Sequence, residues 1–551
     1  MKKRILAMTL IAVCATALWG CSNTDTGSDS SSVAATSEAE SEESAADGTA
    51  KLTVGAVVEQ SSLDPALISD FGSYQVTTQI CDQILDVDAD GNVVDGLVSC
   101  ETEDNITYIL TVKEGVLFSD GTELTAEDVA FSMEHLMDPE TGSTYAALYA
   151  SVASVEVTDT YEVTVTLSEA NSTFDISLTY CYVFSKAAYE EAGEAFGTAE
   201  GGVIGSGAYQ LVTWDQGVST TLVKNEYYDG IDDVDIDEVE VMYFSDTSSL
   251  LLALKSGQVD FWIEPDSGMN GDITALDNVT LDIVEDRTTA TQLVCFNTET
   301  GPFSDVNVRK AVSAMLDTST LMESQYGAGY YLEAANLFVS PGSYGYAEDG
   351  LSELAAETTG YEYNAEAAAE YLAQSDYPDG FSCNIMCWGD SASYNMCIAI
   401  QDALKVLNIE VEVVQQTAEE AVAASYGFST DEDGYRTYDM FVCLWSSSYN
   451  EPLDFYEPLV TTENCGMGGC NIACYSNTAV DELAATAKAA VDESEKADAV
   501  TEMCSLIMED VPYLIVGYKN ATLALNNRFV YENFSASWVS NLSFAEIELA
   551  E

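Results

Sequence analysis

The sequence predicts an α/β protein with more than one hydrophobic core, and three observations lead to this prediction. Segments with the two-residue period of strands interleave with segments of helical period through most of the chain. The 551 residues exceed the length at which a single core keeps growing, so at least two cores are expected. Hydrophobic residues make up 47% of the chain, which is enough to fill them.

The first 20 residues have the pattern of a secretory signal. Three basic residues at positions 2–4 precede an apolar stretch from Ile5 to Leu18, which is too short for a permanent membrane span. Leu18, Gly20 and Cys21 resemble a lipobox, in which the cysteine is acylated and becomes the new N-terminus, although Trp19 departs from the small residue usual there. A plain cleaved signal followed by a chance cysteine is the alternative.

Residues 21–50 are predicted to form a lipid-anchored, disordered tether. Ser22 to Ala50 is rich in Ser, Thr, Ala, Asp and Glu and contains no aromatic residue, so it cannot bury enough apolar surface to fold. An acylated Cys21 would hold the rest of the chain at the extracytoplasmic face of the cell membrane, on the periplasmic side or at the cell surface.

The folded part begins with a strand and then contains the most informative run of the chain. Leu52 to Val58 is a buried type of strand, and residues 61–65 break it. From Ile106 to Lys113 apolar and polar residues alternate, which predicts a half-buried strand. After a turn at Asp120-Gly121, Thr125 and Asp128 have the spacing of a capping box for a helix that ends near Met137.

Further elements follow the same two periods. Residues 155–167 alternate on both sides of Asp159-Thr160 and predict an antiparallel hairpin. Asp305 can cap a helix whose apolar stripe includes Val308 and Val312. Residues 409–413 alternate again, which predicts a strand after a helix ending near Leu407.

Several of these segments resemble the family 5 extracellular solute-binding proteins, the peptide, dipeptide and nickel receptors of ABC importers. The likeness begins with Phe118 to Val129 (FSDG, then LTAEDV) and continues, in the order of the family, over four more blocks. These blocks are Gly205–Gly230, Leu250–Trp262, Phe296–Leu321 and Tyr363–Phe381. The resemblance therefore extends from about residue 51 to the C-terminus.

The resemblance implies a two-lobed, type II periplasmic-binding-protein-like fold, with an extra subdomain inserted in the first lobe and a ligand cleft between the lobes. On this map, lobe one comprises residues 51–80, 205–295 and 517–551, and the inserted subdomain comprises 81–204. Lobe two comprises 296–516. The protein is expected to be a monomer.

Charge, histidine and cysteine content limit the chemistry. A formal net charge of −77 disfavours nucleic acid as a partner. The only histidine, His135, excludes histidine triads and multi-histidine metal sites, and it is expected to be a solvated helix residue. Twelve cysteines follow Cys21, and one disulfide within the loop from Cys465 to Cys474 is the favoured arrangement, with buried free thiols explaining several others.

Neither an enzyme nor a cofactor protein is predicted. Gly205-Ser206-Gly207 lacks the third glycine of a dinucleotide loop and the lysine of a P-loop. No cofactor and no metal are expected. A carboxylate-based extracellular hydrolase stays open as an alternative, because 94 acidic residues guarantee chance pairs. A surface adhesin or sensor on the same fold is the other alternative.

Most candidate ligand-binding residues follow two predicted strands of lobe two. The stretch from Leu444 to Phe455 resembles the cleft segment of the family and supplies Trp445, Ser447, Ser448, Tyr449, Asn450 and Glu451. Trp388 and Asp390 follow the other strand, and Tyr74, after Leu63-Asp64-Pro65, is the candidate from lobe one. Aromatic walls with a few polar anchors suit a binding cleft. Ordinary core packing is the alternative for the aromatic residues among them.

Ser448 stands where the resemblance implies an aspartate that pairs with the α-ammonium group of a peptide. A buried ammonium group without a paired charge is costly, so free N-termini should be recognised weakly unless Glu451 or Asp454 substitutes. Otherwise the ligand is a blocked peptide, a glycan fragment or another polar solute. Changing Ser448 to Asp is expected to raise the affinity for peptides with a free amine.

The predicted function is capture of a peptide or similar polar solute by closure of the two lobes, followed by delivery to separate ABC permease subunits in the membrane.

Overall fold

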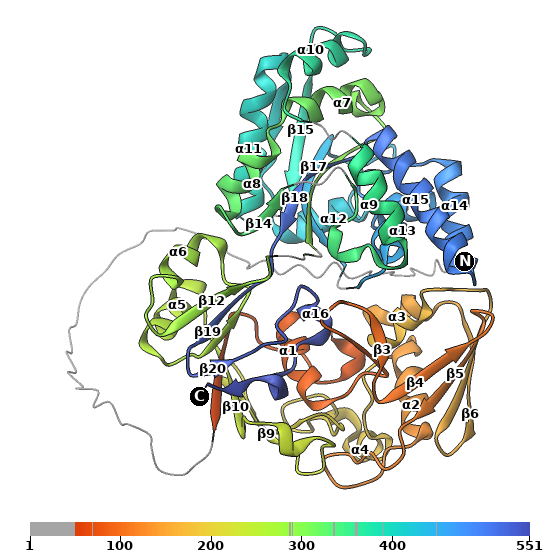
Figure 1. Cartoon of the computed structure of the whole chain (residues 1–551), viewed down its shortest axis with the longest axis vertical. Coiled ribbons are helices and arrows are strands. Elements are labelled where there is room, and N and C mark those ends of the chain that lie inside the picture. The colour runs from red at the N-terminus through yellow and green to blue at the C-terminus, as the bar shows by residue number, and fades with distance from the viewer. Residues whose placement is uncertain are drawn as a thin grey trace, which may run out of the picture.

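The computed structural model describes residues 50–68, 70–285, 288, 290–333, 337–358, 362–388, 391–447 and 449–550, which form two lobes stacked one above the other (Figure 1). Each lobe is built on its own mixed sheet, and a third sheet lies beside the sheet of the lower lobe. The α/β prediction and the two-lobed architecture are confirmed.

Lobe one, the lower lobe in Figure 1, contains a seven-stranded sheet in the order β12-β19-β11-β1-β10-β9-β8. β1 is parallel to β10 and β11, whereas the other pairs are antiparallel. Its strands are β1 (Lys51–Ala56), β8 (Tyr209–Asp215), β9 (Ser219–Lys224), β10 (Glu238–Tyr243), β11 (Phe261–Ile263), β12 (Val279–Ile283) and β19 (Thr522–Asn526), and its helices are α1 (Phe71–Ile80), α5 (Thr247–Ser256), α6 (Asn270–Ile273) and α16 (Trp538–Asn541).

A four-stranded antiparallel sheet, in the order β4-β5-β7-β6, shares one continuous core with lobe one. Its elements are β4 (Val98–Thr102), β5 (Thr107–Val112), β6 (Val152–Asp159), β7 (Glu162–Leu167), α2 (Ala126–Met137), α3 (Phe174–Thr179) and α4 (Lys186–Ala192), preceded by the hairpin of β2 (Leu85–Val87) and β3 (Val93–Asp95). The predicted strand after Ile106 is β5, which buries Tyr108, Leu110 and Val112. The predicted capping box is present at the start of α2, and β6 pairs with β7 as the predicted hairpin.

Lobe two, the upper lobe in Figure 1, contains a six-stranded sheet in the order β14-β18-β13-β17-β15-β16. Its strands are β13 (Ala290–Phe296), β14 (Tyr331–Glu333), β15 (Ser382–Cys387), β16 (Glu410–Val413), β17 (Met440–Ser446) and β18 (Tyr513–Lys519). Successive residues of β17 face opposite sides: Met440 and Val442 join one core, and Phe441, Cys443 and Trp445 join the other. The sheet therefore separates two hydrophobic layers.

Helices cover both faces of this sheet. The layer that includes Val442 is closed by α7 (Val306–Met315), α8 (Thr318–Tyr326), α10 (Ala365–Ala373) and α11 (Ser391–Leu404). The layer that includes Trp445 is closed by α9 (Glu348–Glu357), α12 (Ala418–Ser425), α13 (Pro452–Val460), α14 (Thr478–Ala489) and α15 (Glu493–Asp510). The side chain of Asp305 caps α7 by accepting a hydrogen bond from the backbone N–H of Asn307, as predicted.

The structure moves two of the expected lobe boundaries. β13 lies between β17 and β18 in the sheet of lobe two, although residues 290–295 were expected in lobe one. The end of β18, residues 517–519, also belongs to lobe two. The chain thus passes from the sheet of lobe one to that of lobe two between β12 and β13, and returns between β18 and β19.

The prediction that His135 is a solvated residue is wrong. Its Nε2 lies 3.0 Å from Oδ2 of Asp64, and both side chains are only 9% exposed. The imidazole packs against the rings of Phe184 and Tyr189. The carboxylate comes from a loop 71 residues away in the sequence, so helical spacing alone could not reveal it.

The favoured disulfide within the loop from Cys465 to Cys474 is also wrong. All twelve described cysteines are free thiols, and most are buried. The Cys465 thiol donates to the carbonyl oxygen of Tyr475 over 3.3 Å, and Cys474 Sγ accepts from Nε of Arg436 over 3.4 Å. Each sulfur therefore has another partner.

No helix in the described part of the chain is both long enough and apolar enough to cross a bilayer.

Candidate functional site

The two lobes touch through the segment that follows β17. The hydroxyl of Tyr449 lies 2.8 Å from Oγ1 of Thr179 in lobe one, and its ring packs edge-on against Tyr180 with centroids 5.9 Å apart. Burial raises the pKa of Tyr449 to about 12. The next residue, Asn450, donates its backbone N–H to the carbonyl oxygen of Gly91 over 2.7 Å. This segment is therefore part of the closing surface.

Asn450 also contacts both lobes through its side-chain amide. Its Nδ2 donates to Oδ1 of Asn92 in lobe one over 3.0 Å, and its Oδ1 accepts from the backbone N–H of Gly345 in lobe two over 2.5 Å. A second contact between the lobes lies farther out, where Ser172 donates its N–H to the carbonyl oxygen of Lys488 over 2.8 Å. The described structure thus has its lobes in contact at more than one place.

Tyr74 comes from α1 in lobe one and lies near this surface. Burial raises the pKa of its hydroxyl well above the usual value, and the neighbouring hydroxyls of Tyr449 and Tyr145 add to the effect. Tyr74 and Tyr449, predicted from opposite lobes, are therefore brought together. Tyr145, Tyr180 and Tyr182 complete this group of tyrosines, and the sequence offered no signal for them beyond their residue type.

Trp445 lies at the end of β17 with only 6% of its surface exposed. Its indole N–H is buried and has no hydrogen-bond acceptor among the described residues. A buried donor without a partner costs about 1–3 kcal/mol, so such groups usually mark a place where water or a ligand belongs. Of the predicted aromatic residues of lobe two, Trp445 is the one with an unused donor.

Trp388 has a different environment. It is 5% exposed, its Nε1–H donates to Oγ of Ser425 over 3.1 Å, and its ring packs edge-on against Phe441. The side chain lies in the core of lobe two and its donor is satisfied. Asp390 and Ser448, the two other candidates nearby, lie outside the described residues.

Glu451 is occupied by structural contacts. Its Oε1 caps α13 by accepting from the backbone N–H of Leu453, and its Oε2 lies 2.8 Å from Nζ of Lys496. The two side chains of this ion pair are 13% and 6% exposed. Burial raises the pKa of Glu451, and Lys496 opposes that rise. Of the two acids expected to replace the missing aspartate, this one is already neutralised.

Asp454 is the acid without a cationic partner among the described residues. Its Oδ2 accepts a hydrogen bond of 2.8 Å from the hydroxyl of Ser447, and no described residue forms an ion pair with it. Burial raises the pKa of Asp454 to about 7, and the nearby carboxylates of Glu451, Glu457 and Asp175 act in the same direction. A positively charged ligand group at this point would relieve that repulsion.

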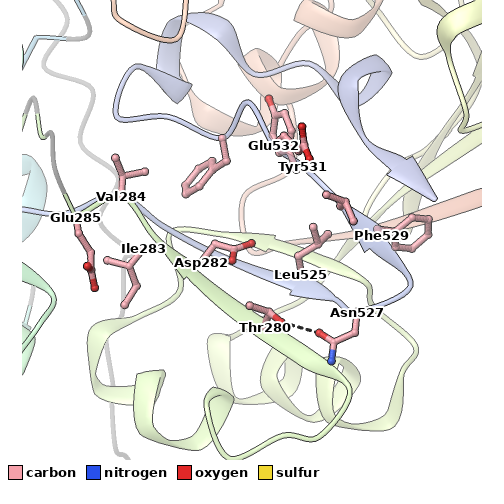
Figure 2. Close-up of a pocket in the computed structure, with 12 residues that line it drawn as sticks. Thr280, Asp282, Ile283, Val284, Glu285, Leu525, Asn527, Phe529, Tyr531 and Glu532 are labelled. Carbon is pink, nitrogen blue, oxygen red and sulfur yellow. Dashed lines mark hydrogen bonds between the residues drawn. The ribbon is translucent and has the colours of Figure 1, made fainter. Parts of the chain in front are cut away.

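A pocket of about 600 Å³ lies on lobe one, just before the chain crosses to lobe two (Figure 2). It is bounded by β12, β19 and the segment from Phe529 to Phe534, which begins in β20 (Phe529–Val530). Of the seven predicted ligand-binding residues that the structure describes, none lines it. The alternation of Thr280, Asp282 and Val284 and the aromatic spacing of FVYENF were the available signals, but both also fit ordinary strand packing.

Comparison with known proteins gives a consistent result. A model of the bacterial extracellular solute-binding proteins, family 5, matches residues 93–466. The glutathione-binding protein GsiB of Salmonella paratyphi A is 26% identical over 463 residues, covering 82% of this chain and 86% of the relative. GsiB of Escherichia coli is 25% identical over 502 residues, covering 89% of this chain and 92% of the relative.

Solved structures show the same architecture. The ABC transporter substrate-binding protein CtaP from Listeria monocytogenes superposes with a TM-score of 0.78 at 19% identity, covering 91% of this chain and 100% of that one. The periplasmic binding protein DppA from Helicobacter pylori, in complex with the peptide STSA, superposes with a TM-score of 0.74 at 20% identity, covering 92% and 99%. Two-lobed binding proteins thus share the fold of this chain.

Proposed function

Because the chain belongs to the bacterial extracellular solute-binding proteins of family 5, we propose that it captures a peptide, or a polar solute of similar size, between its lobes. The family consists of binding proteins and not of enzymes, so we expect this chain to bind and release its solute without changing it chemically. Membrane permease subunits of an ABC importer are the proposed recipients of the bound solute. GsiB binds glutathione and DppA was solved with a peptide, which supports a peptide-like ligand for this chain.

The observation that carries the proposal is the contrast within one short segment. Tyr449 and Asn450 reach across to lobe one, whereas the indole N–H of Trp445 and the carboxyl group of Asp454 have neither an acceptor nor a cation among the described residues. These groups supply one donor and one negative charge in the same short segment that reaches across to lobe one. A peptide carries both complementary groups, since it has backbone carbonyl oxygens and an ammonium group.

Within this proposal Asp454 takes the charge-pairing role that the resemblance assigns to the position of Ser448. The carboxyl group is half-buried and held by Ser447, so its orientation is already set. An ammonium group would favour the ionised form and lower the pKa of Asp454 from about 7. Binding near pH 7 should therefore release a proton.

Native mass spectrometry of solutes that co-purify with the protein, followed by calorimetry with the solutes found, tests the function. Saturable binding of a peptide or polar solute is expected, and its heat should vary with the ionisation enthalpy of the buffer because a proton is released. If no solute co-purifies and no peptide or polar-solute pool gives saturable binding, the capture function is wrong.

Asp454→Asn tests the role of the acid. Affinity for a free-amine peptide should fall by about tenfold or more, which corresponds to loss of one charge-assisted hydrogen bond. Asp433→Asn is the matched control, because Asp433 lies in an exposed turn of the same lobe and makes the same change of charge. Equal affinity of the Asp454→Asn variant and the control would remove Asp454 from the site.

We further propose that Cys21 is acylated and that residues 21–50 tether the binding domain to the membrane. Residues 1–49 lie outside the described part of the chain, so this proposal is supported by the sequence pattern alone. Cys21→Ser should move the protein from the membrane fraction to the soluble fraction. Unchanged fractionation, together with an unacylated mature N-terminus in the wild type, would contradict the anchor.

A further inference from the structure

The pocket on lobe one combines an apolar wall with unpaired negative charge. Its apolar part consists of side chains from β12, β19 and the segment that follows β20, namely Ile283, Val284, Leu525, Phe529, Val530, Tyr531 and Phe534. At about 600 Å³, the pocket has the size of cavities that hold small-molecule ligands. The aromatic rings offer both apolar contact area and a negative face toward a cation.

Among the described residues that line the pocket there are three acids and no base. They are Asp282 on β12, Glu285 at the crossover and Glu532 on the opposite wall. In Figure 2 the carboxylate of Asp282 lies above the strands, and Glu532 and Tyr531 lie on the other side of the pocket, in the segment that follows β20. None of the three acids forms an ion pair among the described residues.

Asp282 is set apart from the many acids on this surface by its surroundings. Most acids of a chain with a net charge of −77 are solvated, but Asp282 is half-buried, and burial raises its pKa. Thr280 lies two residues earlier on the same strand face. Its hydroxyl donates a hydrogen bond of 2.7 Å to Oδ1 of Asn527 and not to the carboxylate of Asp282. A cation beside Asp282 would favour its ionised form.

We propose that this pocket binds a positively charged group of the carried solute, attached to an apolar or aromatic body. The proposal rests on the solute-capture function above and adds the class of solute, an organic cation such as a peptide with a lysine or arginine side chain. The pocket includes Val284 and Glu285, which directly follow β12, so a solute bound there lies at the end of lobe one from which the chain continues to lobe two.

Calorimetry with three tetrapeptides that differ at one side chain tests the pocket. The probes are Ala-Phe-Lys-Ala and its norleucine and glutamate counterparts, so that length and free termini are constant. The lysine peptide is expected to bind at least tenfold more tightly than the norleucine peptide, and the glutamate peptide most weakly.

Asp282→Asn should bring the affinity ratio of the lysine and norleucine peptides close to one, and Glu532→Gln should reduce it less, because Glu532 is exposed. Asp277→Asn is the matched control. Asp277 precedes β12, is exposed and lies outside the pocket, so the ratio should stay at its wild-type value.

The possible results separate this proposal from the function on which it rests. Binding of all three peptides with equal affinity, or a ratio that Asp282→Asn leaves unchanged, overturns the pocket assignment and leaves solute capture standing. If none of the three binds, the charge of the co-purified solute decides, since a neutral or anionic solute overturns the assignment and a cationic one supports it. Absence of both peptide binding and a co-purified solute overturns the two proposals together.

Discussion

The strand, turn and helix from Thr107 to Met137 and the segment from Trp445 to Asp454 differ in which lobe supplies the partners of their polar groups. In the first region the partners come from lobe one itself, as in the capping box of Thr125 and Asp128 and the pairing of His135 with Asp64. In the second region some partners come from the other lobe, as when Asn450 bonds to Gly91. Contacts within one lobe make the first region a framework, and contacts across the lobes make the second one sensitive to lobe closure.

This difference indicates where recognition can reside. A segment whose buried polar groups all have partners has nothing left for a ligand, whatever its resemblance to a family. Among the described residues, the segment from Trp445 to Asp454 keeps the indole N–H of Trp445 without an acceptor and the carboxyl group of Asp454 without a cation. Four substitutions test this contrast.

Lys496→Met is expected to have the largest effect, because it leaves the buried carboxylate of Glu451 without a counter-charge. Loss of one partner of a buried ion pair costs about 3–5 kcal/mol. Chemical denaturation should show this loss in the free energy of unfolding. The double variant Glu451→Gln with Lys496→Met removes both charges and should recover most of the stability; if the single variant loses less than about 1 kcal/mol, the long-range pair does not hold this segment.

Leu110→Ala should destabilise the framework without touching recognition. Leu110 is fully buried in β5, and a leucine-to-alanine change in a core costs about 2–5 kcal/mol, with about 3 kcal/mol expected here. The midpoint of denaturation should fall, whereas the Kd for a bound peptide, measured under folding conditions, should be unchanged. A tenfold change in Kd would show that β5 also contributes to ligand binding and is not framework alone.

Asp454→Asn should change the pH dependence of stability. The pKa of Asp454 is about 7 in the folded protein against an ordinary value of 3.8, so between about pH 4 and pH 7 the folded state holds a proton that the unfolded chain has lost. The free energy of unfolding therefore falls as pH rises through this window, by at most about 1.4 kcal/mol per pH unit from this group.

Denaturation at several pH values from 4 to 7 measures this slope. The Asp454→Asn variant should lose the contribution of Asp454 and keep that of Asp86, whose pKa is raised by burial to about 6 and acts with the same sign. Asp433→Asn should keep the wild-type slope. An identical slope in all three proteins would place Asp454 in solvent.

Tyr449→Phe should have the smallest effect. It removes the hydroxyl that contacts Thr179 across the lobes but keeps the packing against Tyr180, so a loss of about 1 kcal/mol in the closed state is expected. Small-angle scattering should show a larger radius of gyration for the unliganded variant. Tyr161→Phe is the control, since its hydroxyl bonds to Glu123 on the surface of the inserted sheet.

Elements with a regular period could be predicted from the sequence. The alternation after Ile106 became β5, residues 155–167 became the β6 and β7 hairpin, and Asp305 caps α7. These predictions succeed because a strand face, a hairpin and a cap depend on residues within a few positions of one another. The family resemblance uses the same local segments, so it supplied the two-lobed architecture as well.

Partners that meet only in three dimensions could not be predicted. The exposed position expected for His135 failed because Asp64 approaches from another loop, and the disulfide expected near Cys465 failed because Tyr475 and Arg436 supply other partners to the sulfur atoms. Glu451 and Asp454 look alike in the sequence, yet Lys496 neutralises only the first.

Periodicity, caps and family motifs are properties of short segments, so the amino-acid sequence was enough to identify a two-lobed solute-binding protein of family 5. The folded chain was needed to find the groups proposed for the ligand, namely the indole N–H of Trp445, the carboxyl group of Asp454 and the acids of the pocket beside β12. A polar group is available to a ligand only if no other residue already satisfies it, and the residues that could do so are often far away in the sequence.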